Sequence, residues 1–231
     1  MSGILLQVEN LTIRYRDAAE PAVRELCFQL VEGESLSLHG PSGAGKSTVA
    51  WALMGMLEAY RAVGTGHITF AGETVDLEES PGGLRRSWRE IALVPQSSMS
   101  ALNPVRTVEQ TMLEMMEAHE GRGSRRERVR RCEALLQLVR LDAAVLHSYP
   151  HELSGGMRQR LSIALAVMYH PRLLILDEAT TGLDLLVEAD ILGTIRKLRE
   201  REGMSILMIT HDRRLADAFC SRRVEIGGGH G

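Results

Sequence analysis

The stretch GPSGAGKST at residues 40–48 fits the pattern G-x-x-x-x-G-K-[ST]. The apolar run Ser35–Leu38 in front of it predicts a strand, and the sequence from Thr48 to Leu57 is compatible with a helix. A glycine-rich turn between a strand and a helix is the context in which this pattern binds phosphate. The alternative is a glycine-rich turn without a ligand, and the strand and helix context disfavours it.

Each residue type in this stretch has a physical role in holding a triphosphate. Gly40, Gly43 and Gly45 allow the backbone to turn so that successive N–H groups converge on phosphate oxygens. The helix that follows adds the positive end of its dipole. Lys46 is expected to hold the β and γ phosphates, and Ser47 is expected to ligate Mg²⁺.

Composition bounds the class of protein. The chain has 231 residues, 44% of them hydrophobic, which is enough for one substantial core with a second lobe attached. The net charge of -3 gives no global field that would attract nucleic acid, so no nucleic-acid partner is expected. The basic run Arg125–Arg131 is interpreted as a solvated helix face rather than a binding patch.

The cysteines and the apolar runs indicate where the protein works. Cys27, Cys132 and Cys220 are widely separated and lack C-x-x-C spacing, which predicts reduced thiols in a cytosolic protein. The N-terminus does not read as a secretory signal. No run of eighteen apolar residues predicts a membrane-spanning helix, so any membrane role is expected to come through a partner.

Hydrophobic periodicity predicts an α/β fold with a helical insertion. Alternating apolar residues predict antiparallel strands at Ile4–Tyr15 and Glu25–Val31, and a further strand at His67–Phe70. Short apolar runs predict buried parallel strands at Ile91–Val94, Leu173–Leu176 and Ile206–Ile209. Helical spacing is seen at Val108–His119, Arg126–Val139 and Gly156–Tyr169, with one flexible break at Glu120–Ser124.

Polar residues follow three of the predicted buried strands, where open parallel sheets bind ligands. Asp177 is expected in the Mg²⁺ shell, and Glu178 is left to orient and polarise a water. The Gln96 amide can reach the metal or that water, and a neutral His211 can hydrogen-bond the γ phosphate or the water. The alternatives are a solvated acidic pair and a structural histidine.

A further segment, Leu153–Arg160, lies in the helical insertion. Ser154 resembles an N-cap, and Gly155 and Gly156 expose the first amides of the helix that follows. This geometry predicts a second anion site, and the anion is expected to be a γ phosphate held by another chain. An ordinary capped helix is the alternative.

These motifs together resemble the nucleotide-binding subunits of ABC transporters over essentially the whole chain. LSGGMRQR at residues 153–160 resembles the family signature, Asp177-Glu178 its Walker B pair, and Gln96 its Q-loop. Leu183-Asp184 resembles the D-loop, His211 the switch histidine, and Tyr15 the aromatic that stacks on adenine. The resemblance implies an ATPase whose cofactors are ATP and Mg²⁺.

The resemblance also implies which residues form the site. Catalysis is assigned to Glu178, His211, Gln96 and Lys46, and metal binding to Ser47, Gln96 and Asp177. The expected nucleotide contacts are Tyr15, Gly40, Pro41, Ser42, Gly43, Ala44, Gly45, Lys46, Ser47, Thr48, Gln96, Ser154, Gly155, Gly156 and Asp184. Two such domains are expected to close head to tail around two ATP molecules.

The same resemblance implies domains, partners and location. Residues 1–231 are expected to form one ABC ATP-binding domain, with a RecA-like core and antiparallel β subdomain at 1–96 and 171–231 and a helical subdomain at about 97–170. The expected partners are a second ABC ATPase, identical or related, membrane permease subunits and, indirectly, an extracytoplasmic solute-binding protein. The expected location is the cytoplasmic face of the inner membrane.

Met112, Met115 and Met116 could line a groove for a permease helix, with core packing as the alternative.

Residues 94–104 and 149–160 look like the peptide and nickel importer subfamily. Ala179 stands where that subfamily usually has proline, and the sequence stops at Gly231 without the extension of its peptide-importing members. Nickel-type or other small-solute importers are therefore a better comparison. The function predicted is the ATP-hydrolysing motor of an importer for peptides, nickel or a related solute.

Other functional classes remain open from the sequence. One is a non-transport ABC ATPase, such as the subunits of the carbon-phosphorus lyase machinery, and another is a regulatory nucleotide sensor that does not hydrolyse. DNA-repair ATPases of the superfamily are disfavoured because the chain has no sustained heptads.

Overall fold

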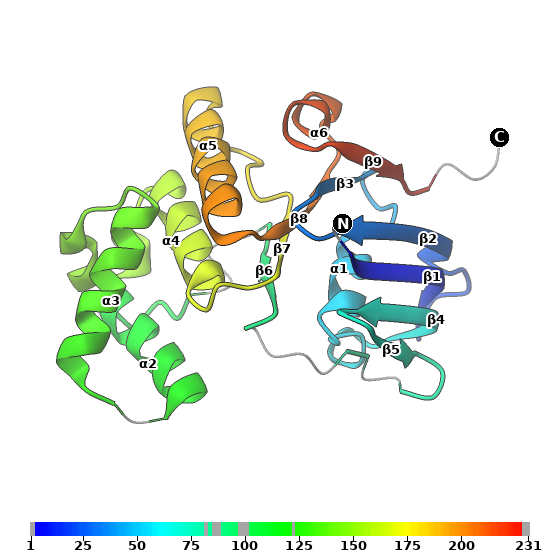
Figure 1. The fold of residues 1–231 in the computed structure, drawn as a ribbon, viewed down its shortest axis with the longest axis horizontal. Helices are drawn as coiled ribbons and strands as arrows, with labels where there is room; N and C mark the ends of the chain where they lie inside the picture. Colours follow the sequence, from blue (N-terminus) through cyan, green and yellow to red (C-terminus); the bar gives the residue numbers. More distant parts are fainter. Residues whose placement is uncertain (1–2, 81–82, 85–88, 97–101, 122, 228–231) are drawn as a thin grey trace. The chain divides into compact units, whose positions relative to one another are not determined.

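The computed structural model describes residues 3–80, 83–84, 89–96, 102–121 and 123–227 (Figure 1). The chain divides into two compact units. The first comprises Met1–Leu93, Tyr169–Glu178 and Leu198–Gly231, and the second comprises Val94–Met168 and Ala179–Lys197. Part of the subfamily motif at 94–104, residues 97–101, lies outside the described residues, as does Arg122 of the predicted break.

The first unit contains a four-stranded antiparallel sheet in the order β2-β1-β4-β5 (Figure 1). Its strands are β1 (Ile4–Tyr15), β2 (Val23–Val31), β4 (Ala62–Phe70) and β5 (Glu73–Asp76). Alternating apolar side chains put one face of this sheet into the core, because successive residues of a strand point to opposite faces. Gly66 has φ +99, and a Cβ there would lie 2.5 Å from the Asn10 carbonyl oxygen, so the irregular β1–β4 pairing requires glycine at this point.

A five-stranded sheet has the order β6-β7-β8-β3-β9. Its strands are β3 (Ser35–His39), β6 (Ile91–Val94), β7 (Leu173–Asp177), β8 (Ser205–Thr210) and β9 (Arg222–Glu225). The pairs β7–β8, β8–β3 and β3–β9 are parallel. Every residue of β7 and β8 is buried, as expected for strands covered on both faces.

The helices are divided between the units. The first unit has α1 (Lys46–Leu53), α6 (Arg213–Phe219) and the 3₁₀ turn Glu58–Tyr60. The second has α2 (Val108–Glu120), α3 (Arg125–Leu138), α4 (Gly155–Val167), and the 3₁₀ turns Ala143–His147 and Pro150–Glu152. Most of α5 (Leu185–Glu202) belongs to the second unit. Within the described part of the chain, no helix is long and apolar enough to cross a membrane.

The predicted elements are present, with shifted ends. The helix after the glycine-rich loop begins at Lys46 and ends at Leu53, before Leu57, because Gly55 has φ +67 and leaves the helical region. Met112 and Met116 are fully buried, so these two residues pack in a core and do not line an open groove. The predicted domain boundaries at about 97 and 170 stay a prediction.

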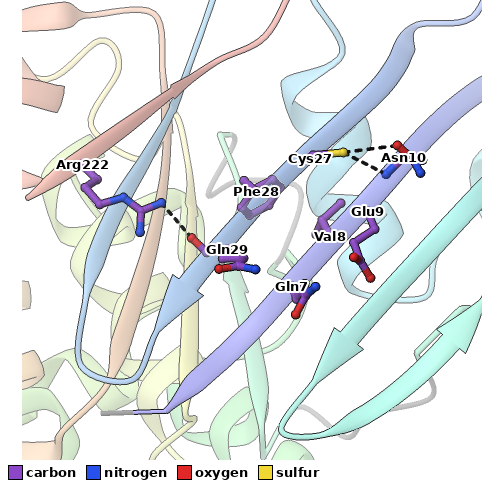
Figure 2. A pocket seen from close by; sticks show the side chains of 8 residues that line it. All are labelled: Gln7, Val8, Glu9, Asn10, Cys27, Phe28, Gln29 and Arg222. Carbon is purple, nitrogen blue, oxygen red and sulfur yellow. Dashed lines mark hydrogen bonds between the residues drawn. The ribbon is translucent and has the colours of Figure 1, made fainter. Parts of the chain in front are cut away.

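The three cysteines lie in different environments. Cys27 is exposed and lines a pocket of about 410 Å³ between β1, β2 and β9 (Figure 2). Figure 2 shows Arg222 of β9 reaching toward β2, where its guanidinium donates to the Gln29 carbonyl oxygen at 3.2 Å. The Asn10 backbone N–H donates to the Cys27 sulfur at 3.1 Å. Burial raises the pKa of Cys132 to about 11 and that of Cys220 to about 12.

Only Cys27 is therefore expected to react rapidly with a thiol reagent in the folded protein at pH 8. Thiolates are the reacting species, and the two raised pKa values suppress them at Cys132 and Cys220. Ellman's reagent should give a fast phase with the folded wild type, and this phase should be absent from Cys27→Ser. In denaturant, all three thiols of the wild type should react. A fast phase that persists in Cys27→Ser would contradict this assignment.

Candidate functional site

The site is built where three neighbouring parallel strands end. In the sheet, β7, β8 and β3 are adjacent, with Asp177 in register with Ile209 and Thr210 in register with His39. The segments that follow these strands carry the acidic pair, His211 and the glycine-rich loop. All of these residues belong to the first unit. This is the carboxyl edge at which open parallel sheets bind ligands.

Two glycines of the loop allow close backbone contacts. Gly45 precedes α1 with φ 83, and a Cβ there would lie 2.5 Å from the Ala22 carbonyl oxygen. A Cβ at Gly40 would lie 2.3 Å from the Ile226 carbonyl oxygen. Both positions therefore exclude other side chains, and the loop keeps its amides at the start of α1, as an anion site requires.

The Lys46 side chain is held inside the loop. Its exposed fraction is 5%, and its Nζ donates to the carbonyl oxygens of Gly40 at 2.9 Å and Pro41 at 2.8 Å. The same Nζ lies 3.8 Å from Glu178 Oε1. A buried ammonium with these partners is positioned for anionic groups that enter the loop.

Asp177 and Ser47 meet across the loop. The Ser47 hydroxyl donates to Asp177 Oδ1 at 3.0 Å. Burial raises the pKa of Asp177 and Glu178 adds to that effect, whereas the Ser47 hydrogen bond and Lys46 act in the opposite direction. A hydroxyl beside a carboxylate is an oxygen pair of the kind that Mg²⁺ uses together with substrate phosphates. Among the described residues, no group of three or more His, Cys, Asp and Glu side chains could hold a metal ion alone.

The backbone of Glu178 adopts a left-handed conformation. Its φ is +47, a left-handed value that a non-glycine residue seldom adopts, and its N–H donates to the Ile209 carbonyl oxygen at 2.9 Å. The turn keeps the side chain largely buried and 3.0 Å from His211 Nδ1. The sequence predicted the acid pair and the histidine but contained no sign of this turn.

Tyr15 lies beside the start of α1. Its hydroxyl makes a 2.8 Å hydrogen bond with the Thr48 hydroxyl. The ring is half-buried at the end of β1. The two residues, far apart in sequence, thus belong to one cluster with the glycine-rich loop.

The other predicted residues belong to the second unit: Gln96, Ser154, Gly155, Gly156 and Asp184. Gln96 is exposed. Ser154 caps α4, since its hydroxyl accepts the Met157 N–H at 3.3 Å, which confirms the predicted cap. Asp184 Oδ1 accepts the N–H groups of Leu186 and Val187 at 3.1 and 3.0 Å at the start of α5.

Sequence reasoning missed Asp212, which fixes the backbone next to His211. Its carboxylate accepts the N–H groups of Arg214 and Leu215 and caps α6. The Asp212 N–H donates to the Thr210 hydroxyl at 3.0 Å. An aspartate directly before a helix is the signal that could have identified it.

A glycine-rich loop between a parallel strand and a helix, facing an Asp-Glu pair, defines the P-loop class of nucleotide-binding proteins. The sequence pattern of the family described as ABC transporter matches residues 23–181. The chain belongs to the ABC transporter family. This confirms both the resemblance and the fold class drawn from the motifs.

Similar proteins support the same family. A dipeptide transport ATP-binding protein of Haemophilus influenzae is 35% identical over 97% of this chain and 69% of its own length. An oligopeptide transport ATP-binding protein of Salmonella typhimurium is 37% identical over 96% of this chain and 67% of its own length. The chain thus spans about two thirds of these relatives. A solved dimeric ATP-binding cassette in a post-hydrolysis state, bound to ADP and Pi, has a TM-score of 0.80 at 28% identity, over 96% of this chain and 94% of that one.

Replacement of Asp212 by Ala is expected to destabilise the fold by about 1 kcal/mol at pH 7, the usual value of an N-cap. Burial alone would raise the pKa of Asp212, but hydrogen bonds from the Arg214 side chain and from the Leu215 and Arg214 N–H groups lower it. A lowered carboxyl pKa stabilises the fold at neutral pH, and this stabilisation is lost as pH falls through the folded-state value.

Urea unfolding of both proteins from pH 7 down to about 3.5 measures this difference, which should narrow below about pH 4. Asp212→Asn is the matched control, because it keeps a capping oxygen without a charge. A constant difference between wild type and Asp212→Ala across that range would show that the charged carboxylate is not the cap.

Proposed function

We propose that this chain is the ATP-hydrolysing subunit of an ABC transporter that imports peptides or a related small solute. The observation that carries the proposal is the gathering of Lys46, the Ser47–Asp177 pair and the Glu178–His211 pair at one sheet edge. Relatives named for dipeptide and oligopeptide transport support the substrate class.

ATP enters the glycine-rich loop with its phosphates against the amides before α1. Residues 40–48 surround the β and γ phosphates, and Lys46 Nζ exchanges its contacts with the Gly40 and Pro41 carbonyls for phosphate oxygens. The Tyr15 ring stacks on adenine at the rim of the loop. Its hydroxyl bond to Thr48 keeps that ring next to the loop.

Mg²⁺, when bound, neutralises charge on the β and γ phosphate oxygens. Ser47 and Asp177 would hold it, and Gln96 is proposed as a further ligand. The Ser47 hydroxyl and the Asp177 carboxylate, 3.0 Å apart, are oxygen donors suited to this ion.

Glu178 acts as the general base in hydrolysis. Its carboxylate accepts a proton from the water that attacks the γ phosphorus, and the bond from this phosphorus to the bridging oxygen of ADP breaks. His211 orients Glu178 through their hydrogen bond and can also contact the γ phosphate. Lys46 and the loop amides neutralise the charge that spreads over the phosphate oxygens.

A second ABC ATPase, identical or related, completes each site. Ser154, Gly155, Gly156 and Asp184 of one subunit contact the nucleotide in the loop of the other, so that two ATP molecules join the pair. The capped start of α4 supports this role, because its free amides favour an anion. The dimeric cassette that this chain resembles supports the expectation of a pair.

The subunit works at the cytoplasmic face of the inner membrane, bound to permease subunits that receive solute from an extracytoplasmic binding protein. The helices of the second unit that follow Gln96 in sequence are proposed to contact the permease. Separation of the ATPases after hydrolysis resets the permease.

Replacement of Glu178 by Gln is expected to keep ATP binding and lower kcat by about a hundredfold or more, because the amide cannot take the proton from water. Steady-state phosphate release and binding of a fluorescent ATP analogue measure the two properties. Glu202→Gln is a control with the same chemical change at another carboxylate of the first unit, and it should keep both. Wild-type turnover in Glu178→Gln would falsify the assignment of the base.

The phosphate-release assay on the wild type also tests the non-hydrolysing nucleotide sensor. Co-purification separates the transporter from a soluble ABC complex of the carbon-phosphorus lyase kind. Recovery with integral membrane subunits supports the transporter, whereas recovery with soluble metabolic enzymes supports the alternative.

A further inference from the structure

We infer that Asp190 is a positioning residue that locks α4 to the first turns of α5, so that Ser154 and Asp184 meet the sister nucleotide as one rigid piece. This inference rests on the proposed function. Asp190 is not proposed to contact the nucleotide or the attacking water. It acts through Arg160 on the helix that Ser154 begins.

One carboxylate joins three segments of the second unit. Asp190 of α5 accepts from Arg160 of α4 through one oxygen and from Arg140, just after α3, through the other. The Arg160 side chain is 17% exposed and that of Asp190 is 30% exposed, so this pair is better shielded from water than an ordinary surface ion pair. In Figure 1, α4 runs between α3 and α5.

Arg160 has a second partner on the backbone, and Arg140 lies in a turn. Arg160 also donates to the Val139 carbonyl oxygen at 3.2 Å, which ties α4 to the end of α3. Arg140 has φ +58, a strained value that turns the chain directly after α3. A tilt of α4 that takes Arg160 away from Asp190 would therefore also disturb its hydrogen bond to Val139.

A second contact lies one helical turn nearer to Ser154. A Cβ at Gly156 would lie 2.9 Å from Val187 Cγ1, so α4 and α5 approach closely at this point. Gly156 and Arg160 are four residues apart on α4, and Val187 and Asp190 are three residues apart on α5. Each pair therefore shares one helix face. Two contacts in successive turns fix both the distance and the tilt of the helices.

The consequence for the site is geometric. Ser154 is six residues before Arg160, about 9 Å along the helix, so a small tilt at Arg160 moves the Ser154 end on the order of 1 Å. Displacements of that size in groups that contact a reacting phosphate lower rates by up to about a hundredfold. Removal of Asp190 also leaves two guanidinium groups facing each other without their common counter-ion.

The test compares Asp190→Asn and Asp190→Glu with the wild type in the chain of residues 1–231. Asp190→Asn should lower kcat about tenfold, and in the Glu178→Gln background it should raise the ATP concentration for half-maximal dimer formation about tenfold. Binding of a fluorescent ATP analogue to the single subunit should stay within about twofold, because the loop lies in the other unit. Asp190→Glu should recover most of the kcat.

The matched control is Glu32→Gln, which removes a carboxylate from an ion pair with Arg172 in the first unit and should change none of these values. If the wild type is active and Asp190→Asn has the same kcat and dimer formation, the inference about Asp190 is overturned, and the proposed function is not. A kcat of Asp190→Asn that returns to the wild-type value at temperatures below its unfolding transition would also overturn the inference. The loss of kcat would then come only from unfolding of the variant. Absence of ATP hydrolysis and of dimer formation in the wild type itself would overturn the proposed function, and the inference with it.

Discussion

The contact between the Lys46 ammonium and the Glu178 carboxylate, 3.8 Å apart, is the constraint on which the rest of the first unit depends. Two largely buried charges need partners, and here the loop carbonyls of Gly40 and Pro41 and the His211 ring supply them. Those partners follow β3 and β8, and Glu178 itself follows β7, so the order of the parallel strands is what brings the charges together. Gly40 and Gly45 let the loop backbone approach the carbonyl oxygens of Ile226 and Ala22 more closely than a Cβ would allow.

The two units carry different parts of the proposed chemistry. The first holds the loop, the acidic pair and His211, which are the groups proposed to bind the nucleotide of their own subunit and to activate the water that attacks it. The second holds Ser154, Gly156 and Asp184, which are proposed to act on the nucleotide of a sister subunit. Because α4 and α5 are joined at Gly156–Val187 and at Arg160–Asp190, the groups offered to the sister are held together by contacts within one unit.

Much of this arrangement could be predicted from residues near each other in sequence. The buried strands β6, β7 and β8 were predicted from short apolar runs, and the Ser154 cap from one serine before two glycines. The strands β5 and β9 were missed because both are short, polar edge strands without a core-facing pattern. The left-handed turn at Glu178 and the partners of Asp190 depend on contacts made far along the chain, which no local pattern reveals. The catalytic and binding roles assigned to site residues stay predictions.

The positive φ of Glu178 has a consequence for how this protein can be stabilised. A glycine at that position would relieve the steric conflict of an L side chain, which is worth roughly 1–2 kcal/mol, but it would remove the carboxylate. Selection for thermostability alone would therefore favour a chain that has lost its proposed base. Any engineered variant that gains heat resistance through this turn needs its turnover measured before it is called improved.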